Sequence, residues 1–423
     1  MIPVYSDPYG HDPRVDRIAT LRSAAADDAP SPLFELAGAL LAEGKLEESL
    51  LLHARSALAG HDGAQVEYGR MLLFGIGCEP DPQLALGWLA QAESQHHPVA
   101  SYWLAWVAMG SVLLPRDERM NQRLRVAVNH DYPPALRAAA LHYGRRPGAA
   151  DQKACIHLLE RAARRGDLVA ALLLAERLQR GEGCTAQPQA AATWRAWLRE
   201  RQVEPLPPTV APGPRFDGAL LRHREPAPLA LEDALNTPPA RVLSNEPRVV
   251  QVDAVLSSDE CRLLIAMAML NDPTRGAVVP TLRIDPAQED LALRVLQLRL
   301  ARSAQAELAH AEAIEVERRI PGSPDWRHRD YLAPDDLALD HPDAGNRRRT
   351  LCVCLHEPEA GGGHEFPFGL LETQAIAGSA VVVDNLMADG HPDPYSMHAG
   401  IAVERGEQWQ ATLWLRERRY RSF

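Results

Sequence analysis

The sequence has 423 residues, of which 46% are hydrophobic and 24% are charged, and its formal net charge is -11 at pH 7. This composition is typical of a globular protein rather than of a disordered chain, and the length predicts two or three domains. The acidic balance disfavours general binding to nucleic acid, which requires a basic face, and no run of about 18 apolar residues predicts a membrane span.

The N-terminus and the cysteines suggest where the protein resides. The first residues, MIPVYSDPYGHDPR, contain no basic stretch followed by an apolar segment, so we expect no secretory signal. The six cysteines form no C-x-x-C pair with a matching partner, which argues against a zinc site or a disulfide scaffold. We therefore expect reduced thiols in a cytoplasmic protein.

Residues 31–203 contain a repeat with a period of about 35 residues. Matching alanines occur at Ala64, Ala100, Ala135 and Ala170, which are 36, 35 and 35 residues apart. The first and last copies share a glycine turn, GIGC at 75–78 and GEGC at 181–184. Each copy is predicted to form two helices, and stacking of the copies buries the apolar face that a single hairpin leaves exposed.

This pattern resembles the Sel1-like repeat, a relative of the tetratricopeptide repeat, over roughly residues 63–203, and most specifically in the first and fourth copies. Residues 31–62 look like one more helical hairpin, and residues 1–30 are interpreted as an N-terminal extension. The resemblance implies an all-α solenoid that binds a protein or peptide, although such a solenoid can also be purely structural. Tyr102, Trp103 and Trp106 either line the binding surface or belong to the repeat core.

Residues 204–247 are predicted to be a proline-rich linker, because EPLPPTVAPGP cannot form a helix. After it, RVVQVDAVLSSDECRLLIAMAM predicts a strand and then a helix with Ser257 or Ser258 as its N-cap. From Ile314 onwards short β-like segments such as RTLCVCLHE and QWQATLWLRER alternate with glycine, proline and aspartate clusters. Residues 248–423 are therefore predicted to form a β-sandwich or barrel.

A possible metal site is indicated by the string His328-Arg-Asp330. Alternate residues of a strand point the same way, so His328 and Asp330 can share a metal. Two histidines and a carboxylate on one face of an iron leave three coordination positions open for chemistry. Two further H-x-D strings, His341-Pro-Asp343 and His391-Pro-Asp393, carry a central proline, which removes a hydrogen bond from a paired strand. The first string is therefore favoured.

Four segments resemble the prolyl 4-hydroxylase family in their order and cover nearly all of residues 248–423: DAVLSSDEC, PGSPDWRHRD, NRRRTLCVCLHEPEAGGGHEFP and GSAVVVDNLMADGHPDPYSMHAGIAVERGEQWQATLWLRER. The resemblance implies a double-stranded β-helix, or jelly roll, with flanking helices, and iron ligands His328, Asp330 and His398. It also implies an Fe(II)- and 2-oxoglutarate-dependent dioxygenase that consumes O2, with ascorbate as a candidate further cofactor. A carboxylate at Asp330 favours hydroxylation, because related halogenases carry a small residue there.

Four positions depart from the family pattern at the 2-oxoglutarate pocket, and one of them is a second tyrosine position, which aligns with Asp325. The lysine ten residues after the distal histidine is replaced by Gln408, the tyrosine nine residues before the H-x-D histidine by Arg319, and the threonine of the glycine turn by His364. We expect Arg319 to hold the far carboxylate in a two-pronged pair, with hydrogen bonds from Gln408 and His364. Arg347 and Arg349 are the reserve candidates. Alternatively, the protein no longer uses 2-oxoglutarate or no longer catalyses.

The leading hypothesis is a dioxygenase that hydroxylates a protein or peptide, at proline as is usual in the family, with the repeats recruiting the substrate. A solenoid is larger than a free amino acid requires, which favours a macromolecular substrate. A catalytically inactive oxygenase fold that serves as a scaffold is a second hypothesis. An oxygenase that acts on a small molecule in secondary metabolism is a third.

Overall fold

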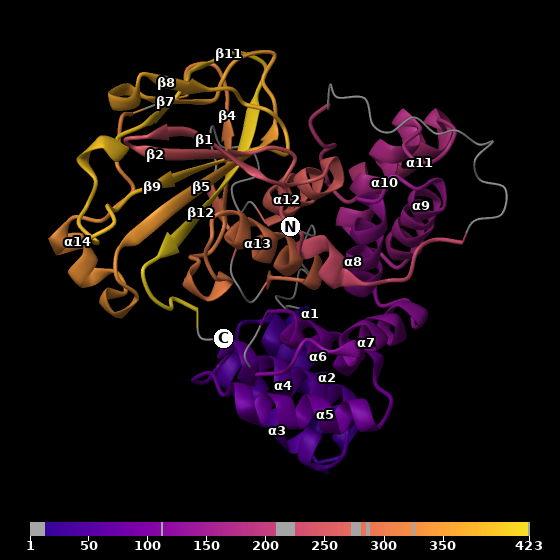
Figure 1. The fold of residues 1–423 in the computed structure, drawn as a ribbon. Coiled ribbons are helices and arrows are strands. Elements are labelled where there is room, and N and C mark those ends of the chain that lie inside the picture. The colour runs from indigo at the N-terminus through magenta and orange to yellow at the C-terminus, as the bar shows by residue number, and fades with distance from the viewer. Residues whose placement is uncertain are drawn as a thin grey trace. The chain divides into compact units, whose positions relative to one another are not determined.

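The computed structural model describes residues 13–110, 113–208, 225–271, 281–284, 288–323 and 326–421 (Figure 1). The chain forms two compact units, residues 1–130 and 131–423. The predicted N-terminal extension and linker each include residues outside this description, namely 1–12 and 209–224. Helices fill the first unit, whereas the second contains helices followed by β-sheets.

The first unit is built from helical hairpins joined by short turns. Its described helices are α1 (Pro13–Ala24), α2 (Pro30–Ala42), α3 (Leu46–Leu58), α4 (Asp62–Phe74), α5 (Pro82–Ser94), α6 (Pro98–Ala108) and α7 (Glu118–Asn129). The predicted hairpin of residues 31–62 corresponds to α2 and α3. Part of the predicted extension is helical, since Ile18 of α1 packs in one core with Leu33 and Leu36 of α2.

The glycine turn of the repeat has a steric reason. Gly75 ends α4 with φ 67°, a left-handed conformation that suits glycine, and Gly77 follows with φ 78°. A Cβ atom on Gly77 would lie 2.8 Å from the carbonyl oxygen of Leu46, at the start of α3. In the last copy, a Cβ atom on Gly183 would lie 2.9 Å from the carbonyl oxygen of Gln152. The second glycine therefore lets the turn approach the backbone of the preceding repeat.

The aromatic residues of the second copy lie in the repeat core. Tyr102 and Trp106 are each 1% exposed, and Trp103 is 8% exposed. The ring of Phe74 contacts Trp103 and Trp106 edge-on, at centroid distances of 5.7 and 5.3 Å. Of the two interpretations of these aromatics, the structure therefore supports the core and not an open binding surface.

The second unit begins with two more helical hairpins, formed by α8 (Pro133–Gly144), α9 (Ala149–Arg164), α10 (Leu168–Arg180) and α11 (Pro188–Arg199). The third and fourth copies of the repeat thus share a compact unit with the C-terminal domain. Three further helices occur in that domain: α12 (Ser258–Asn271), α13 (Leu291–Ser303) and α14 (Pro334–Leu339). A capping box starts α12, because Glu260 N–H donates to Ser257 Oγ while Ser257 N–H donates to the Glu260 carboxylate.

The strands of the C-terminal domain form one large sheet and two small ones. The large sheet has the order β1-β2-β9-β5-β12-β4-β3, and the small sheets have the orders β10-β7-β8 and β11-β6. The strands are β1 (Ala240–Asn245), β2 (Arg248–Val252), β3 (Thr281–Arg283), β4 (Glu315–Arg319), β5 (Arg347–His356), β6 (Ala360–Gly361), β7 (His364–Phe366), β8 (Leu371–Thr373), β9 (Ala380–Asp384), β10 (Ala399–Gly400), β11 (Val403–Arg405) and β12 (Gln408–Arg416). This arrangement agrees with the expected jelly roll.

The structure corrects the prediction that residues 204–247 are an extended linker throughout. Residues 231–235 form a 3-10 helix, and β1 pairs antiparallel with β2 at the edge of the large sheet. Proline residues flank β1 at Pro239 and Pro247, and because of them the sequence pattern did not predict a strand here. An edge strand tolerates such neighbours because only one of its sides needs ladder hydrogen bonds.

The two faces of the large sheet have different environments. On one face Leu351 and Val353 of β5 and Leu413 of β12 are fully buried, and helices α12 and α13 contact these strands (Figure 1). The small sheet β10-β7-β8 packs on the opposite face, where Phe366 of β7 forms a core with Val249 and Val383 of the large sheet. Residues that alternate with the first set therefore point between the two sheets.

Helices α10 and α12 are joined by a buried group of charged side chains, here called the α10–α12 charge cluster (Arg177, Glu182, Asp259 and Arg262). Arg177 Nε lies 3.1 Å from both carboxylate oxygens of Asp259. Arg262 donates to both oxygens of Glu182, at 2.7 and 2.9 Å. All four side chains are 2–3% exposed. Each buried charge is therefore matched by an opposite one.

Candidate metal centre

The backbone brings His328 and His398 together although 70 residues separate them. The N–H of His328 donates to the carbonyl of His398 at 2.9 Å, and the N–H of His398 donates to the carbonyl of His328 at 3.0 Å. The centroids of the two imidazole rings are 4.6 Å apart. This short antiparallel bridge fixes both histidines on the same side of the two segments.

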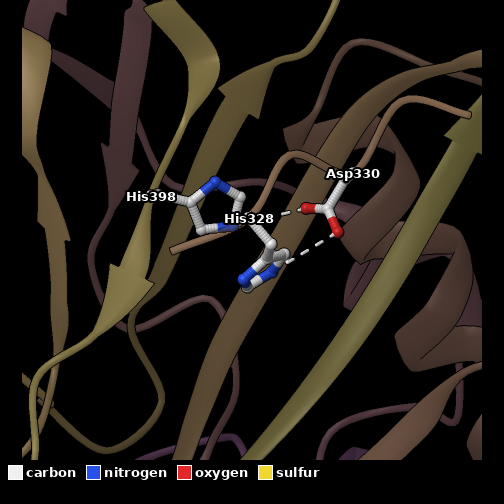
Figure 2. A group of neighbouring side chains, drawn as sticks. All are labelled: His328, Asp330 and His398. Atoms are coloured by element: carbon white, nitrogen blue, oxygen red, sulfur yellow. Dashed lines mark ion pairs between the residues drawn. The ribbon is translucent and has the colours of Figure 1, made fainter. Parts of the chain in front are cut away.

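Asp330 completes the group, and Figure 2 shows its carboxylate facing the two rings. His398 Nε2 lies 3.4 Å from Asp330 Oδ2, and His328 Nε2 lies 3.8 Å from Asp330 Oδ1. One ligand atom from each residue lies within 4.8 Å of the others, and no second such group occurs among the described residues. Ligands at about 2.0–2.2 Å from a divalent ion are only about 3 Å apart, so small adjustments would admit one.

Hydrogen bonds to the backbone orient both imidazole rings. His328 Nδ1 lies 2.8 Å from the carbonyl oxygen of Trp326, and His398 Nδ1 lies 2.9 Å from that of Ser396. Each Nδ1 must carry the proton in order to donate to a carbonyl, so the neutral ring keeps a lone pair on Nε2. Metal-binding histidines typically donate their second nitrogen in this way. Both Nε2 atoms face Asp330, which makes the group suitable for a cation.

Two buried polar residues hold the Asp330 carboxylate. Thr350 Oγ1 donates to Asp330 Oδ2 at 2.7 Å, and Asn385 Nδ2 donates to Thr350 Oγ1 at 2.9 Å. Because Asn385 occupies an acceptor site of the hydroxyl, the hydroxyl proton points to Asp330. Oδ2 is therefore engaged, and Oδ1 is left for a metal. Thr350 and Asn385 both lie in segments that resemble the family, but the sequence gave no role to Asn385.

The charge of Asp330 also suits a cation site. Burial alone would lower the pKa of His398, but the hydrogen bond and charge of Asp330 raise it, so a metal ion would compete with a proton for His398 Nε2. Burial tends to raise the pKa of Asp330, but the hydrogen bond and charge of His398, together with the hydrogen bond from Thr350, lower it well below its usual value. The Asp330 and His398 side chains are 7% and 6% exposed, whereas that of His328 is 53% exposed. The carboxylate is thus ionised and buried, and the site opens to solvent on the His328 side.

The other two H-x-D strings form no comparable group in the described part of the chain. The His341 side chain is 61% exposed and lies 4.0 Å from Asp340, and the His391 side chain is 75% exposed and lies 3.3 Å from Asp389. His341 precedes the 3-10 helix of residues 342–344, and His391 lies beside the isolated bridge of Pro392, whereas His328 forms its isolated bridge with His398. The preference for the His328 string therefore agrees with where the side chains converge.

A cavity of about 420 Å³ opens onto the three residues. Strand β4 contributes Glu315, Glu317 and Arg319, and the remaining lining residues are Trp326, His328, Asp330, Thr350, Cys352, His364, His398, Gly400, Gln410, Thr412 and Trp414. Two of the three residues expected to bind 2-oxoglutarate are thus in the cavity wall. The third, Gln408, is not among the described lining residues. Gln410, which lies two residues further along the same face of β12, lines the cavity instead.

Arg319 is a buried cation in this wall. It is 3% exposed, and its Nη2 donates to the carbonyl of Ile401 at 3.4 Å. Its guanidinium group packs so closely on Gly400 that a Cβ atom there would collide with it. Burial lowers the pKa of Arg319, which the charge of Glu317 partly offsets, yet a guanidinium remains charged in proteins. The neighbouring Arg318 instead points outward to Glu407.

Gln408 and His364 differ in their contacts and in their relation to the cavity. Gln408 is 1% exposed, accepts a hydrogen bond from the N–H of Gly363 at 3.2 Å, and donates to Gln410 at 3.2 Å. It therefore ties β12 to the glycine turn. Burial, followed by the charges of His398 and Arg319, lowers the pKa of His364 to about 3. His364 is therefore neutral at physiological pH.

The reserve arginines are engaged outside the expected carboxylate position. Arg347 donates to both carboxylate oxygens of Glu312 at 2.8 and 2.9 Å, and its guanidinium lies 4.1 Å from the ring centroid of Trp414. Arg349 donates to Asp384 at 2.6 Å. Neither residue lines the cavity in the described part of the chain.

Comparison with known proteins agrees with both halves of the sequence pattern. The Sel1 repeat model matches residues 63–97, 133–167 and 168–194. Probable prolyl 4-hydroxylase 9 of Arabidopsis thaliana is 23% identical over 217 residues, which are 44% of this chain and 74% of that protein. Prolyl 4-hydroxylase 1 of the same plant is 26% identical over 205 residues, which are 42% of this chain and 71% of that protein. The chain combines Sel1 repeats with a prolyl 4-hydroxylase-like domain.

Among solved structures, the 2-oxoglutarate complex of the viral collagen prolyl hydroxylase from Paramecium bursaria Chlorella virus 1 is 23% identical, and the match covers 40% of this chain and 94% of that chain with a TM-score of 0.34. The Sel1 model recognises the third copy of the repeat, which the sequence pattern had marked as degenerate. The second copy lies outside the matched residues, yet α6 and α7 form its hairpin. None of the described helices is long and apolar enough to span a membrane.

Proposed function

We propose that the prolyl 4-hydroxylase-like domain is an Fe(II)- and 2-oxoglutarate-dependent dioxygenase that hydroxylates a protein or peptide at proline. The observation that carries this proposal is the convergence of His328, Asp330 and His398, with both Nε2 lone pairs and one carboxylate oxygen facing one point beside an open cavity. The relation to proteins named prolyl 4-hydroxylases supports the reaction class.

His328, Asp330 and His398 would hold ferrous iron, because two histidines and one carboxylate are a typical ligand set for it and would leave positions for a 2-oxo acid and O2. With these bound, the iron supplies the oxidising power for hydroxylation while 2-oxoglutarate is converted to succinate and CO2. The backbone carbonyls of Trp326 and Ser396 hold the imidazole tautomers in place. Thr350 engages Oδ2 of Asp330, so this carboxylate would offer its other oxygen to the metal.

The register of the large sheet indicates how 2-oxoglutarate would be oriented in the cavity. Trp414 of β12 pairs with Thr350, which contacts Asp330, so this end of the strand lies at the metal site. Gln408, at the other end of β12, pairs with Arg319. The Arg319 guanidinium packs on Gly400, which is only two residues after His398, so a dicarboxylate bound at the metal would extend towards Arg319. A two-pronged, charge-assisted pair with the guanidinium would replace the lysine of the family.

We further propose that the repeats recruit the substrate and that ascorbate assists turnover. The similarity to Sel1 repeats supports the first point, because stacked repeats form extended surfaces for protein partners. Packing of α10 on α12 supports it as well, since the charge cluster couples the last repeat to the oxygenase fold. Ascorbate and a cytoplasmic location remain predictions from the sequence.

The decisive experiment measures succinate formed from 2-oxoglutarate by the full-length protein, with and without Fe(II), together with mass spectrometry of a proline-containing peptide library. Active protein is expected to form succinate only with iron and to add one oxygen atom to a subset of peptides. His328→Ala is the negative control, and His391→Ala, at an exposed H-x-D string, is the matched positive control. Metal binding without any succinate would overturn the proposal and favour the inactive scaffold.

A further inference from the structure

Strand β4 carries two carboxylates into the cavity of the proposed active site. Glu315, Glu317 and Arg319 alternate along the strand, and all three line the cavity. The proposed function gives a role to Arg319 and none to the two glutamates. Both are partly buried, so neither belongs to a freely solvated face.

The register of the sheet places Glu315 near the metal end of the cavity. Glu315 pairs with Thr412 of β12, and Glu317 pairs with Gln410. Thr412 is two residues from Trp414, which pairs with Thr350 beside the metal ligands. Glu315 and Glu317 thus flank the path from the metal towards Arg319, on the β4 side of the cavity.

Neither glutamate forms an ion pair within 4.0 Å in the described part of the chain, although the charge of Glu317 acts on Arg319. Glu317 accepts a hydrogen bond from the neutral side chain of Gln410 at 3.0 Å. No Lys, Arg or His nitrogen of the described chain lies within 4.0 Å of the Glu315 carboxylate. The cations that act on it most, Arg283 and Arg347, both lie nearer Glu312, at 3.8 and 2.8 Å. Burial accordingly raises the pKa of Glu315.

If the site held Fe(II) and 2-oxoglutarate, the charges of Glu315 and Glu317 would not be balanced by the cations of the site. The two positive charges of a ferrous ion and the one of Arg319 balance the single charge of Asp330 and the two of 2-oxoglutarate. Carboxylates taken out of water are costly unless a cation faces them. We propose that Glu315 and Glu317 form a subsite for a cationic group, and that the substrate is a peptide whose lysine or arginine side chain enters there.

The cavity also has surfaces for the apolar part of such a side chain. The ring of Trp414 forms part of the wall, and Trp326, also a lining residue, is 78% exposed. Lysine and arginine combine an aliphatic stem with a charged head, and aromatic rings bind both parts. A wall that contains both carboxylates and aromatic rings therefore suits a basic residue better than an acidic or apolar one.

The test compares binding of four fluorescein-labelled peptides that differ at one position beside a central proline, which is lysine, arginine, norleucine or glutamate. Anisotropy is measured with full-length protein loaded with Mn(II) and 2-oxoglutarate under nitrogen, so the readout does not depend on turnover. The lysine and arginine peptides are expected to bind about tenfold or more tightly than the norleucine peptide, as expected for charge-assisted hydrogen bonds. The glutamate peptide is expected to bind most weakly.

The Glu315→Gln/Glu317→Gln double variant should bind the lysine and norleucine peptides equally. Glutamine keeps the acceptor for Gln410, and circular dichroism checks that the variant is folded. The matched control is Glu372→Gln, an exposed glutamate of β8, which should keep the preference. Equal binding of all four peptides by the wild type, or a lysine preference that survives in the double variant, overturns the proposal.

Two further measurements separate this inference, which rests on the proposed function, from that function itself. Free lysine or arginine that binds with the same dependence on Glu315 and Glu317 would support the cationic subsite and assign it to a small-molecule substrate. Wild-type protein that prefers the lysine peptide but forms no succinate with iron would refute the proposed oxygenase and leave the subsite standing. Succinate formation without any lysine preference would do the reverse.

Discussion

The second unit contains two groups of buried charges that differ in one respect. In the α10–α12 charge cluster, the Asp259 carboxylate faces Arg177, and the positive charge and hydrogen bonds of that arginine overcome burial and lower the pKa of Asp259. At the proposed metal centre, the Asp330 carboxylate is nearly as buried but faces two histidines and a threonine. The first group is electrically complete, whereas the second is complete only with a cation.

This difference separates structure from function in residues of the same types. A closed set of charges favours one arrangement of helices and offers little to a ligand, because each carboxylate already faces an arginine. A group of lone pairs directed at a common point lowers the free energy of unfolding of the free protein, and binding of a cation raises it again. The following experiments test this contrast, beginning with the largest expected effect.

Replacing His328 by alanine should abolish metal binding and turnover but leave the metal-free protein nearly as stable as before. The His328 side chain is 53% exposed and packs little, whereas a missing ligand breaks the facial set. In the wild type, metal at about 100 times its dissociation constant should add about 2.7 kcal/mol to the free energy of unfolding. Calorimetric titration with Mn(II) and thermal unfolding with and without metal measure both effects. Equal stabilisation of variant and wild type would contradict the assignment.

Replacing Arg177 by methionine should lower the free energy of unfolding by about 3–5 kcal/mol, because it leaves the buried Asp259 carboxylate without its main cation. Urea-induced unfolding followed by circular dichroism measures the loss. The matched control is Arg164→Met, whose ion pair with Glu160 is exposed and should be worth less than about 1 kcal/mol. A loss at Arg177 no larger than that of the control would show that the cluster is not a closed stabilising set.

Replacing Arg319 by alanine should raise the Michaelis constant for 2-oxoglutarate roughly 10- to 100-fold, because a charge-assisted pair with a carboxylate contributes about 1.5–3 kcal/mol. Metal affinity without co-substrate should stay nearly unchanged. Arg318→Ala is the neighbouring control, since that side chain pairs with Glu407 on the outside. We also expect Gln408→Lys to be tolerated poorly, because it would put a second cation beside one carboxylate. An unchanged Michaelis constant in Arg319→Ala would exclude this pocket arrangement.

Replacing Thr350 by valine should weaken metal binding by roughly tenfold, the lower end of the effect of removing an outer partner of a metal ligand. Valine keeps the shape of the side chain but leaves Oδ2 of Asp330 without its donor. Asn385→Ala should have a smaller effect in the same direction, because Asn385 acts through Thr350. Metal titrations of both variants, with the electronic spectrum of bound Co(II) as a second readout, measure the change. Identical affinity and spectra in all three proteins would show that Thr350 does not position Asp330.

Much of the candidate site could be predicted because its signals are local. His328 and Asp330 are two residues apart on one segment, and the alternation along β4 required one of Arg318 and Arg319 to face inward. His398 was placed by family resemblance and not by geometry. The cavity role of Gln410, the contact of Asn385 with Thr350 and the position of Glu315 could not be predicted, because each depends on which strands pair and in which register.

By itself, the sequence determined the kinds of elements in this protein and the residues proposed to bind a metal. The 35-residue period with its glycine turns specifies helical hairpins, and alternating strands specify which side chains share a face, because both follow from local backbone geometry. Only the tertiary structure decided which of these residues meet. It pairs β1 with β2 despite the flanking prolines, packs α10 against α12, and brings His398 to His328. Such contacts depend on burial and on hydrogen bonds between distant segments, and a periodic pattern contains no record of them.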